Sequence, residues 1–176
     1  VLSNIAGGLV ILVTKPFQLG DLVETADGLG TVKEISLTFT KLETPDGLWL
    51  MTPNSVLSSG KITNYTALGR RRAEIRVGAS YDAAVSDVRA ACLDAAARVP
   101  GVLPDPAPIV YVDSYGESSI SYIVRVWCRS EDYTDVYYGL TEGLKAAFDE
   151  HGVEMPYNHL NIHILDQTEQ KEKQTV

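Results

Sequence analysis

The sequence predicts an α+β protein built from three consecutive parts: a short apolar helix, a small all-β unit, and a unit in which strands and helices alternate. Three observations predict this. The first fourteen residues, VLSNIAGGLVILVT, carry no charge. Residues 21–65 are short β-branched runs separated by turn motifs. After LGRRR, at residues 68–72, the apolar periodicity alternates between strand-like and helix-like.

Composition supports a folded chain and excludes some function classes. The 176 residues are 45% hydrophobic and 22% charged, which suits one domain or two small ones. The net charge of −8 makes nucleic acid an improbable general partner. Cys92 and Cys128 do not form a disulfide framework, and both fall in apolar patterns, so we expect buried free thiols.

The opening segment is predicted to be a helix over residues 1–14, because Lys15-Pro16 ends the apolar run. One face carries the large apolar residues Leu2, Ile5, Leu9, Leu12 and Val13. The other face carries smaller residues, namely Ser3, Gly7, Val10 and Thr14. Gly7 and Gly8 cost about 1 kcal/mol each relative to alanine, but they allow another segment to pack closely. At about 21 Å the helix is too short for a bilayer. The segment does not resemble a signal peptide, so we expect a chain cut from a longer one.

The β unit follows over residues 21–65. DLVET and ADGLG predict a strand and a turn at Asp27-Gly28, and TVKEISLTFTKLET continues as strand. PDG makes the next turn and LWLMT the next strand. Thr52 is expected to cap a short helix that begins at Pro53 and ends at Gly60, before the strand KITNY. About five short strands, strongly bent, suggest an Sm-like or OB-like β domain.

The last part reads as β-α-β-β-α-β, the order of a ferredoxin-like domain. Strands are predicted at 72–79, 109–113, 118–129 and 160–165. Helices are predicted from an Asp82 cap to about Val99 and over 132–151, where Gly152 ends the second. This fold hosts many functions, so it settles none of them.

No catalytic or metal motif stands out. His159 and His163 are four apart, but they lie on a predicted strand without further ligands, so solvated histidines are expected. The acids Glu131, Asp132 and Asp135 sit at a helix N-terminus, where the helix dipole favours them. DGLG lacks the context of a phosphate loop. The basic cluster Arg70, Arg71 and Arg72 suits a linker salt-bridge cluster or a basic rim on an aqueous passage.

Taken in order, these segments resemble the small-conductance mechanosensitive channel (MscS) family. The stretches that carry the resemblance are LSNIAGGLVILVTKPFQLGDLVE, GLGTVKEISLTFTKLETPDGLWLMTPNSVL, ITNYTALGRRR, VGASYDAAVSDV, SSISYIVRVW and FDEHGVEMPYNHLNIHI. They cover nearly the whole chain. Leu68 departs from the polar or charged residue expected in this linker, and the family's earlier membrane helices are missing.

The resemblance implies a domain order. Residues 1–16 would be the lower half of the pore-lining transmembrane helix, and 17–67 the middle β domain. Residues 68–158 would form the ferredoxin-like domain. A strand at 159–166 would close a parallel β-barrel between subunits, since LNIHIL has no partner of its own. A polar tail would occupy 167–176.

The resemblance also implies a function. This chain would form the cytoplasmic vestibule of a tension-gated channel that releases ions and small solutes on hypo-osmotic shock. It would work as a homo-oligomer of seven subunits in the bacterial inner membrane, in contact with lipids. The resemblance implies no cofactor and no metal. It also implies neither catalysis nor nucleic-acid binding. Tension would favour the state of larger membrane area without any ligand.

The family suggests particular site residues. Asn4 on the pore helix would meet Gly47 at the PDG turn and couple the helix to the β domain. The alternative is that Asn4 caps a helix and Gly47 serves its turn alone. Gly7 and Gly8 would pack the pore helix closely rather than form a hinge. Arg70, Arg71 and Arg72 would line a side portal.

Two other functions remain open from sequence alone. A soluble module could hold a small ligand between the β unit and the ferredoxin-like unit, although it has no use for an uncharged first helix. An enzyme could use the histidine-bearing C-terminal segment; for a channel, changing His159 and His163 together would leave conductance largely intact.

Overall fold

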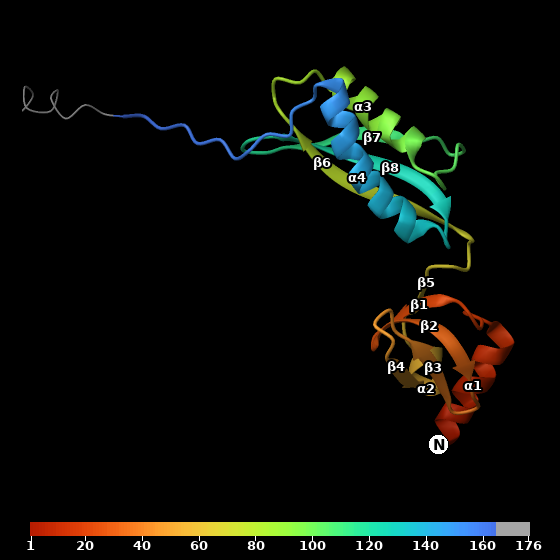
Figure 1. Ribbon diagram of the computed structural model, residues 1–176. Coiled ribbons are helices and arrows are strands. Elements are labelled where there is room, and N and C mark those ends of the chain that lie inside the picture. The colour runs from red at the N-terminus through yellow and green to blue at the C-terminus, as the bar shows by residue number, and fades with distance from the viewer. Residues whose placement is uncertain (165–176) are drawn as a thin grey trace, which may run out of the picture.

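The computed structural model describes residues 1–164 and divides them into an N-terminal β unit and a C-terminal α/β unit, joined through residues 65–70 (Figure 1). The elements of the β unit are α1 (Leu2–Thr14), β1 (Leu22–Thr25), β2 (Gly28–Ile35), β3 (Phe39–Glu43), β4 (Trp49–Pro53), α2 (Asn54–Ser59) and β5 (Thr63–Asn64). Those of the α/β unit are β6 (Arg70–Ala79), α3 (Val85–Arg98), β7 (Ile109–Tyr115), β8 (Ile120–Arg129) and α4 (Tyr133–His151). The expected α+β class is confirmed.

The β unit is a five-stranded antiparallel sheet in the order β4-β3-β2-β1-β5. The run TVKEISLTFTKLET is not one strand, because a turn at Ser36–Thr38 divides it into β2 and β3. The sheet bends at a register shift between Val32 and Glu34. The bulge increases the local twist. Apolar side chains from the strands and both helices fill one small core: Ile11, Phe17, Val23, Val32, Leu42 and Leu57.

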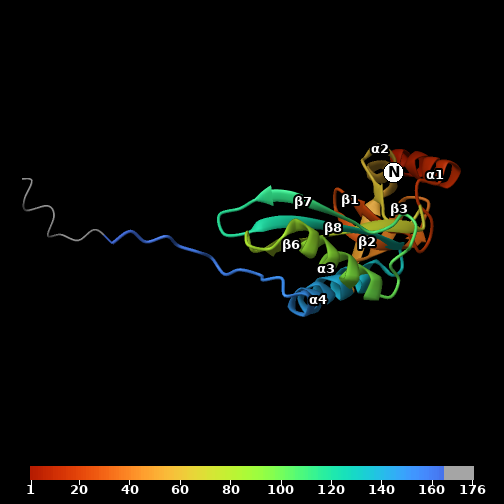
Figure 2. The same ribbon diagram turned by 90° about the horizontal axis from the view of Figure 1, so that it is seen from above.

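The α/β unit is a three-stranded antiparallel sheet, β6-β8-β7, with α3 and α4 covering one face (Figures 1 and 2). Alternate residues of β8 point to the helices and are buried, among them Tyr122, Val124 and Val126. The two cores share no residue. Cys92 and Cys128 are buried free thiols here, as expected, and burial raises the pKa of Cys92 to about 12.

Two helix starts differ from the expectation. α2 begins at Asn54 with Pro53 as its N-cap, and the Thr52 hydroxyl donates to Asp27 Oδ2 at 3.0 Å instead of capping. α3 begins at Val85 with Ala84 as its N-cap, so Asp82 is not the cap. α4 does end at Gly152, whose left-handed backbone (φ 66°) suits glycine.

The fourth strand of the ferredoxin-like order is not part of this sheet. After α4, Val153 is buried and Ser80 N–H donates to the Glu154 carbonyl, but residues 157–164 are exposed and form no regular element. The blue segment of Figure 1 runs away from both units. A strand needs a neighbouring strand for its backbone groups, and none of the described strands pairs with this segment. Leu165 and the predicted tail lie outside the described residues.

Candidate functional site

The candidate site is the surface where α1 docks on the β unit. α1 buries its small face, with Gly7, Gly8 and Ile11 against the sheet and α2. Its other face exposes large apolar side chains: Leu2, Leu9, Val10, Leu12 and Val13. A helix that hides glycines and exposes leucines is unusual for a water-solvated surface, where the apolar stripe faces the core. The exposed face is therefore suited to apolar surroundings.

The two glycines allow direct backbone contact. A Cβ on Gly7 would lie 2.6 Å from the Asn54 carbonyl oxygen. A Cβ on Gly8 would lie 2.3 Å from the Leu37 carbonyl oxygen and 2.8 Å from Asn54 Nδ2. Real Cβ atoms do not approach so closely, so any side chain at these positions would push α1 off the β unit. Gly7 and Gly8 are thus packing residues, but their neighbours belong to the β unit of the same chain.

Asn54 is the fixed polar group beneath the glycines, and its side chain is fully buried. Its Oδ1 accepts from the Thr40 hydroxyl at 2.8 Å, and its Nδ2 donates to the Ser36 carbonyl at 2.8 Å. Its backbone N–H donates to the Thr38 carbonyl at 3.0 Å. A buried amide satisfied in this way holds the β2–β3 turn against the start of α2.

Asn4 makes the polar contact between α1 and α2. Its Oδ1 accepts from the Ser55 backbone N–H at 3.2 Å and also from the Ser55 hydroxyl. The first N–H groups of a helix have no intrahelical acceptor, so an amide oxygen supplies one. Asn4 does not meet Gly47, which lies in the turn between β3 and β4, with φ 79° and open space around its Cα.

A second polar cluster holds the chain where it leaves α1. The carboxylate of Asp21 accepts from Gln18 N–H, Asn64 Nδ2 and the Thr66 hydroxyl at 2.8–2.9 Å. Partial burial opposes its charge, yet these three hydrogen bonds keep the pKa of Asp21 below its usual range. The cluster joins the α1–β1 connection to the end of β5.

The predicted arginine cluster is the start of β6, and its three members have different neighbours. The Arg70 guanidinium lies 5.2 Å from the Trp127 ring centroid, and Arg71 lies 3.5 Å from that of Tyr133. Arg72 reaches Glu74 at 3.9 Å. Glu74 also receives Arg125 at 2.8 Å, and this hydrogen bond, with the neighbouring arginines, lowers the pKa of Glu74.

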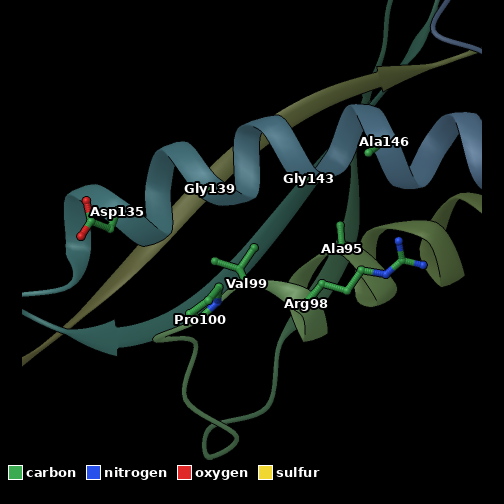
Figure 3. Close-up of a pocket in the computed structure, with 8 residues that line it drawn as sticks. All are labelled: Ala95, Arg98, Val99, Pro100, Asp135, Gly139, Gly143 and Ala146. Atoms are coloured by element: carbon green, nitrogen blue, oxygen red, sulfur yellow. The ribbon is translucent and has the colours of Figure 1, made fainter.

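A groove of about 450 Å³ lies between α3 and α4 (Figure 3). Its lining is mostly small and apolar, and its two charged residues, Asp135 and Arg98, lie toward opposite ends. Such a lining offers no paired acid and base within reach of one bound molecule. Among residues 1–164, no group of three or more His, Cys, Asp or Glu side chains could hold a metal ion.

The three histidines lie apart from the surface where α1 docks. His159 is on the exposed C-terminal segment, where its N–H donates to the Ser118 hydroxyl at 2.9 Å, and His163 is exposed further along. His151 Nε2, at the end of α4, lies 3.0 Å from Asp94 Oδ2 of α3.

Ser55 and Asn54 were not anticipated as site residues. A signal was present in TPNS, because a short polar helix start leaves N–H groups free for an outside acceptor.

None of the helices in residues 1–164 combines the length and apolar character needed to cross a membrane.

Comparison with known proteins identifies both units separately. Residues 1–67 match the family described as mechanosensitive ion channel, beta-domain. Residues 73–155 match the family described as mechanosensitive ion channel MscS, C-terminal.

Curated relatives and solved structures agree. The small-conductance mechanosensitive channel of Edwardsiella ictaluri is 31% identical over 163 residues, which cover 93% of this chain and 57% of that protein. The channel of the same name from Helicobacter pylori is 29% identical, covering 97% and 62%. The closed-state crystal structure of Helicobacter pylori MscS superposes with a TM-score of 0.87, covering 94% of this chain and 66% of that one, at 29% identity. The chain therefore spans less than two thirds of these relatives.

Proposed function

Because this chain belongs to the MscS family of mechanosensitive ion channels, we propose that it is part of a channel subunit that opens under membrane tension and releases ions and small solutes on hypo-osmotic shock. The observation that carries the proposal is the docking of α1. Its glycine face is fixed to the β unit, and its apolar face is exposed as membrane contact requires.

We propose that α1 is the lower half of a pore-lining helix, with its exposed face against lipid or other membrane helices. The Asn4–Ser55 contact would then couple this helix to the β unit; the Asn4–Gly47 pair that the resemblance implies is not formed within one chain. If the tilt of the helix differs between the closed and open states, one state would keep this contact and the other would lose it. The strength of the contact would then bias the equilibrium between the two states.

The assembly we propose is a ring of seven copies in the bacterial inner membrane, with the α/β units forming a vestibule beneath it. The exposed C-terminal segment supports this proposal. Leu160, Ile162 and Ile164 are each more than 70% exposed and alternate with polar residues. That alternation is typical of a strand with one apolar face, and a closed barrel of such strands from several copies would leave no free edge. Arg70 and Arg72 would lie on the rim of a portal.

Osmotic downshock tests the function. The complete coding sequence is expressed in bacteria that lack their own mechanosensitive channels, and survival after transfer from high to low osmolarity is counted. Rescue is expected, and Gly8→Val should abolish it because its side chain displaces α1. A well-expressed, membrane-inserted wild-type protein that gives no rescue would contradict the proposal.

Small-ligand binding between the units is not favoured by any of the matched families. No catalytic role is proposed for His159 or His163. Survival in the same downshock assay should be unchanged when both are replaced by glutamine.

A further inference from the structure

The junction between the β unit and the α/β unit is built from few contacts. The two hydrophobic cores share no residue, and the backbone passes between them through Ala67, Leu68 and Gly69. Gly69 has φ 69°, and all three residues are exposed. A short exposed connection with a glycine would by itself act as a hinge.

One arginine lies between aromatic rings from both units. The Arg71 guanidinium is 4.7 Å from the ring centroid of Tyr65, at the exit of the β unit, and 3.5 Å from that of Tyr133, at the start of α4. A guanidinium attracts the faces of aromatic rings, and its planar shape allows it to stack between two of them. Arg71 is half-buried, unlike its exposed neighbours Arg70 and Arg72.

Both rings are held by their own unit, and Tyr133 stacks on Tyr137 of α4 with 6.1 Å between ring centroids. The Tyr65 hydroxyl donates to Glu24 Oε2 of β1 at 2.6 Å, which fixes this ring to the β unit. The Ser130 hydroxyl donates to the Tyr65 carbonyl at 3.3 Å, and the Ser130 N–H donates to the Gly69 carbonyl at 3.1 Å. Ser130 lies directly before the turn that starts α4. This short segment of the α/β unit therefore hydrogen-bonds the connection at Tyr65 and at Gly69.

We propose that Arg71, stacked between Tyr65 and Tyr133, is a clamp that turns the 65–70 connection from a hinge into a rigid joint. The clamp sets the orientation of the α/β unit relative to the β unit, and it links β1 through Tyr65 to the first turn of α4. This inference concerns the shape of one chain and does not depend on channel activity.

Spin labels measure the joint directly. Cysteines placed at Asp46, in the β3–β4 turn, and at Glu117, in the β7–β8 turn, carry the labels after Cys92 and Cys128 are changed to alanine. Labelled chains are diluted with unlabelled ones so that each distance lies within one chain. The wild-type arginine should give one narrow distance distribution, and Arg71→Gln should broaden it.

Hydrogen exchange is a second measurement of the same joint. In Arg71→Gln, exchange of the Gly69 amide, which donates to the Thr66 carbonyl, should accelerate roughly three- to tenfold, the factor that one such contact contributes.

Matched variants separate the clamp from a general loss of charge or packing. Arg70→Gln removes a stacked arginine within the α/β unit and should leave the distribution narrow. Tyr133→Phe keeps the ring and should behave like wild type, while Tyr133→Leu should broaden the distance as Arg71→Gln does. Tyr133→Leu also serves if Arg71→Gln folds poorly. Equal distributions in Arg71→Gln, Tyr133→Leu and wild type would overturn the inference, whereas failure of the proposed function would leave it standing.

Discussion

Gly7 and Gly8 are the residues whose identity the structure constrains most tightly. The Cα atoms face carbonyl oxygens of Asn54 and Leu37 at distances that leave no room for a methyl group. Most helical glycines weaken a helix without a compensating contact. Here the missing side chains allow α1 to rest on backbone, so the docking geometry depends on them.

Replacing Gly8 with alanine should therefore destabilise the β unit, by about 1–3 kcal/mol from overpacking. Gly143→Ala is the matched control, since its Cβ would meet Val99 Cγ2 at an ordinary 3.8 Å. That variant should gain about 0.5–1 kcal/mol of helix stability. Urea unfolding measures both free energies, followed by tryptophan fluorescence in a Trp127→Phe background for Gly8→Ala and by circular dichroism for Gly143→Ala. Equal stabilities of Gly8→Ala and wild type would contradict the tight docking.

Asp21 makes stability depend on pH on the acid side. Its hydrogen bonds hold the folded-state pKa below the ordinary value of 3.8, so the contribution is present above that value and is lost as the pH falls through the folded pKa. The unfolding free energy of wild type should fall more steeply between about pH 5 and pH 2 than that of Asp21→Asn. Asp46→Asn, at the exposed β3–β4 turn, is the control and should follow wild type. Parallel curves for wild type and Asp21→Asn would refute this role.

At the scale of elements, α1 is the part whose surroundings are incomplete in one chain. Its exposed leucines and valines are on the side away from the β unit, so burial in lipid would satisfy them without disturbing the docked face. Vesicles of phosphatidylcholine test this, because they carry no net charge to repel a chain of net charge −8.

The chain should bind such vesicles, and Leu9→Gln with Leu12→Gln should weaken binding about tenfold or more, given the cost of exposing each leucine. Leu68→Gln removes an exposed leucine from the connection instead and should bind as wild type does. Co-sedimentation measures the partition. Equal loss in both variants would show that α1 is not the membrane-facing element.

Periodicity and turn chemistry predicted most elements, because those signals are local. β8 alternates except at Ile123, which is buried between Tyr122 and Val124, and Gly152 ends α4 where expected. Helix starts were less accurate: the Thr52 hydroxyl does not cap α2, and α3 begins at Val85, three residues after Asp82. Thr52 bonds Asp27, 25 residues earlier, and no local pattern encodes that partner.

The candidate site was only partly predictable for the same reason. Asn4, Gly7 and Gly8 stand out in an uncharged helix, but their partners come from α2 and the β2–β3 turn, more than 25 residues away. The family resemblance suggested Gly47 as the partner, and a glycine there would allow a close approach. The structure uses the free N–H of Ser55, which any residue but proline could supply.

At the level of the whole molecule, the exposed C-terminal segment supports the proposed association with further copies. The β unit exposes the apolar face of α1, and the C-terminal segment exposes Leu160, Ile162 and Ile164. A single chain leaves these apolar groups in water, which costs free energy that association with further copies would recover.

We propose that α1, fixed to the β unit through its glycines and Asn4, moves as part of a tension-sensitive pore. Patch recording tests it most directly, with the protein from the complete coding sequence reconstituted in liposomes and suction applied stepwise. Openings should become more frequent as suction rises. Asn4→Ala should shift the threshold or alter closure, and Asn161→Ala on the exposed segment should leave both unchanged. A reconstituted protein whose current is absent or independent of suction would contradict it.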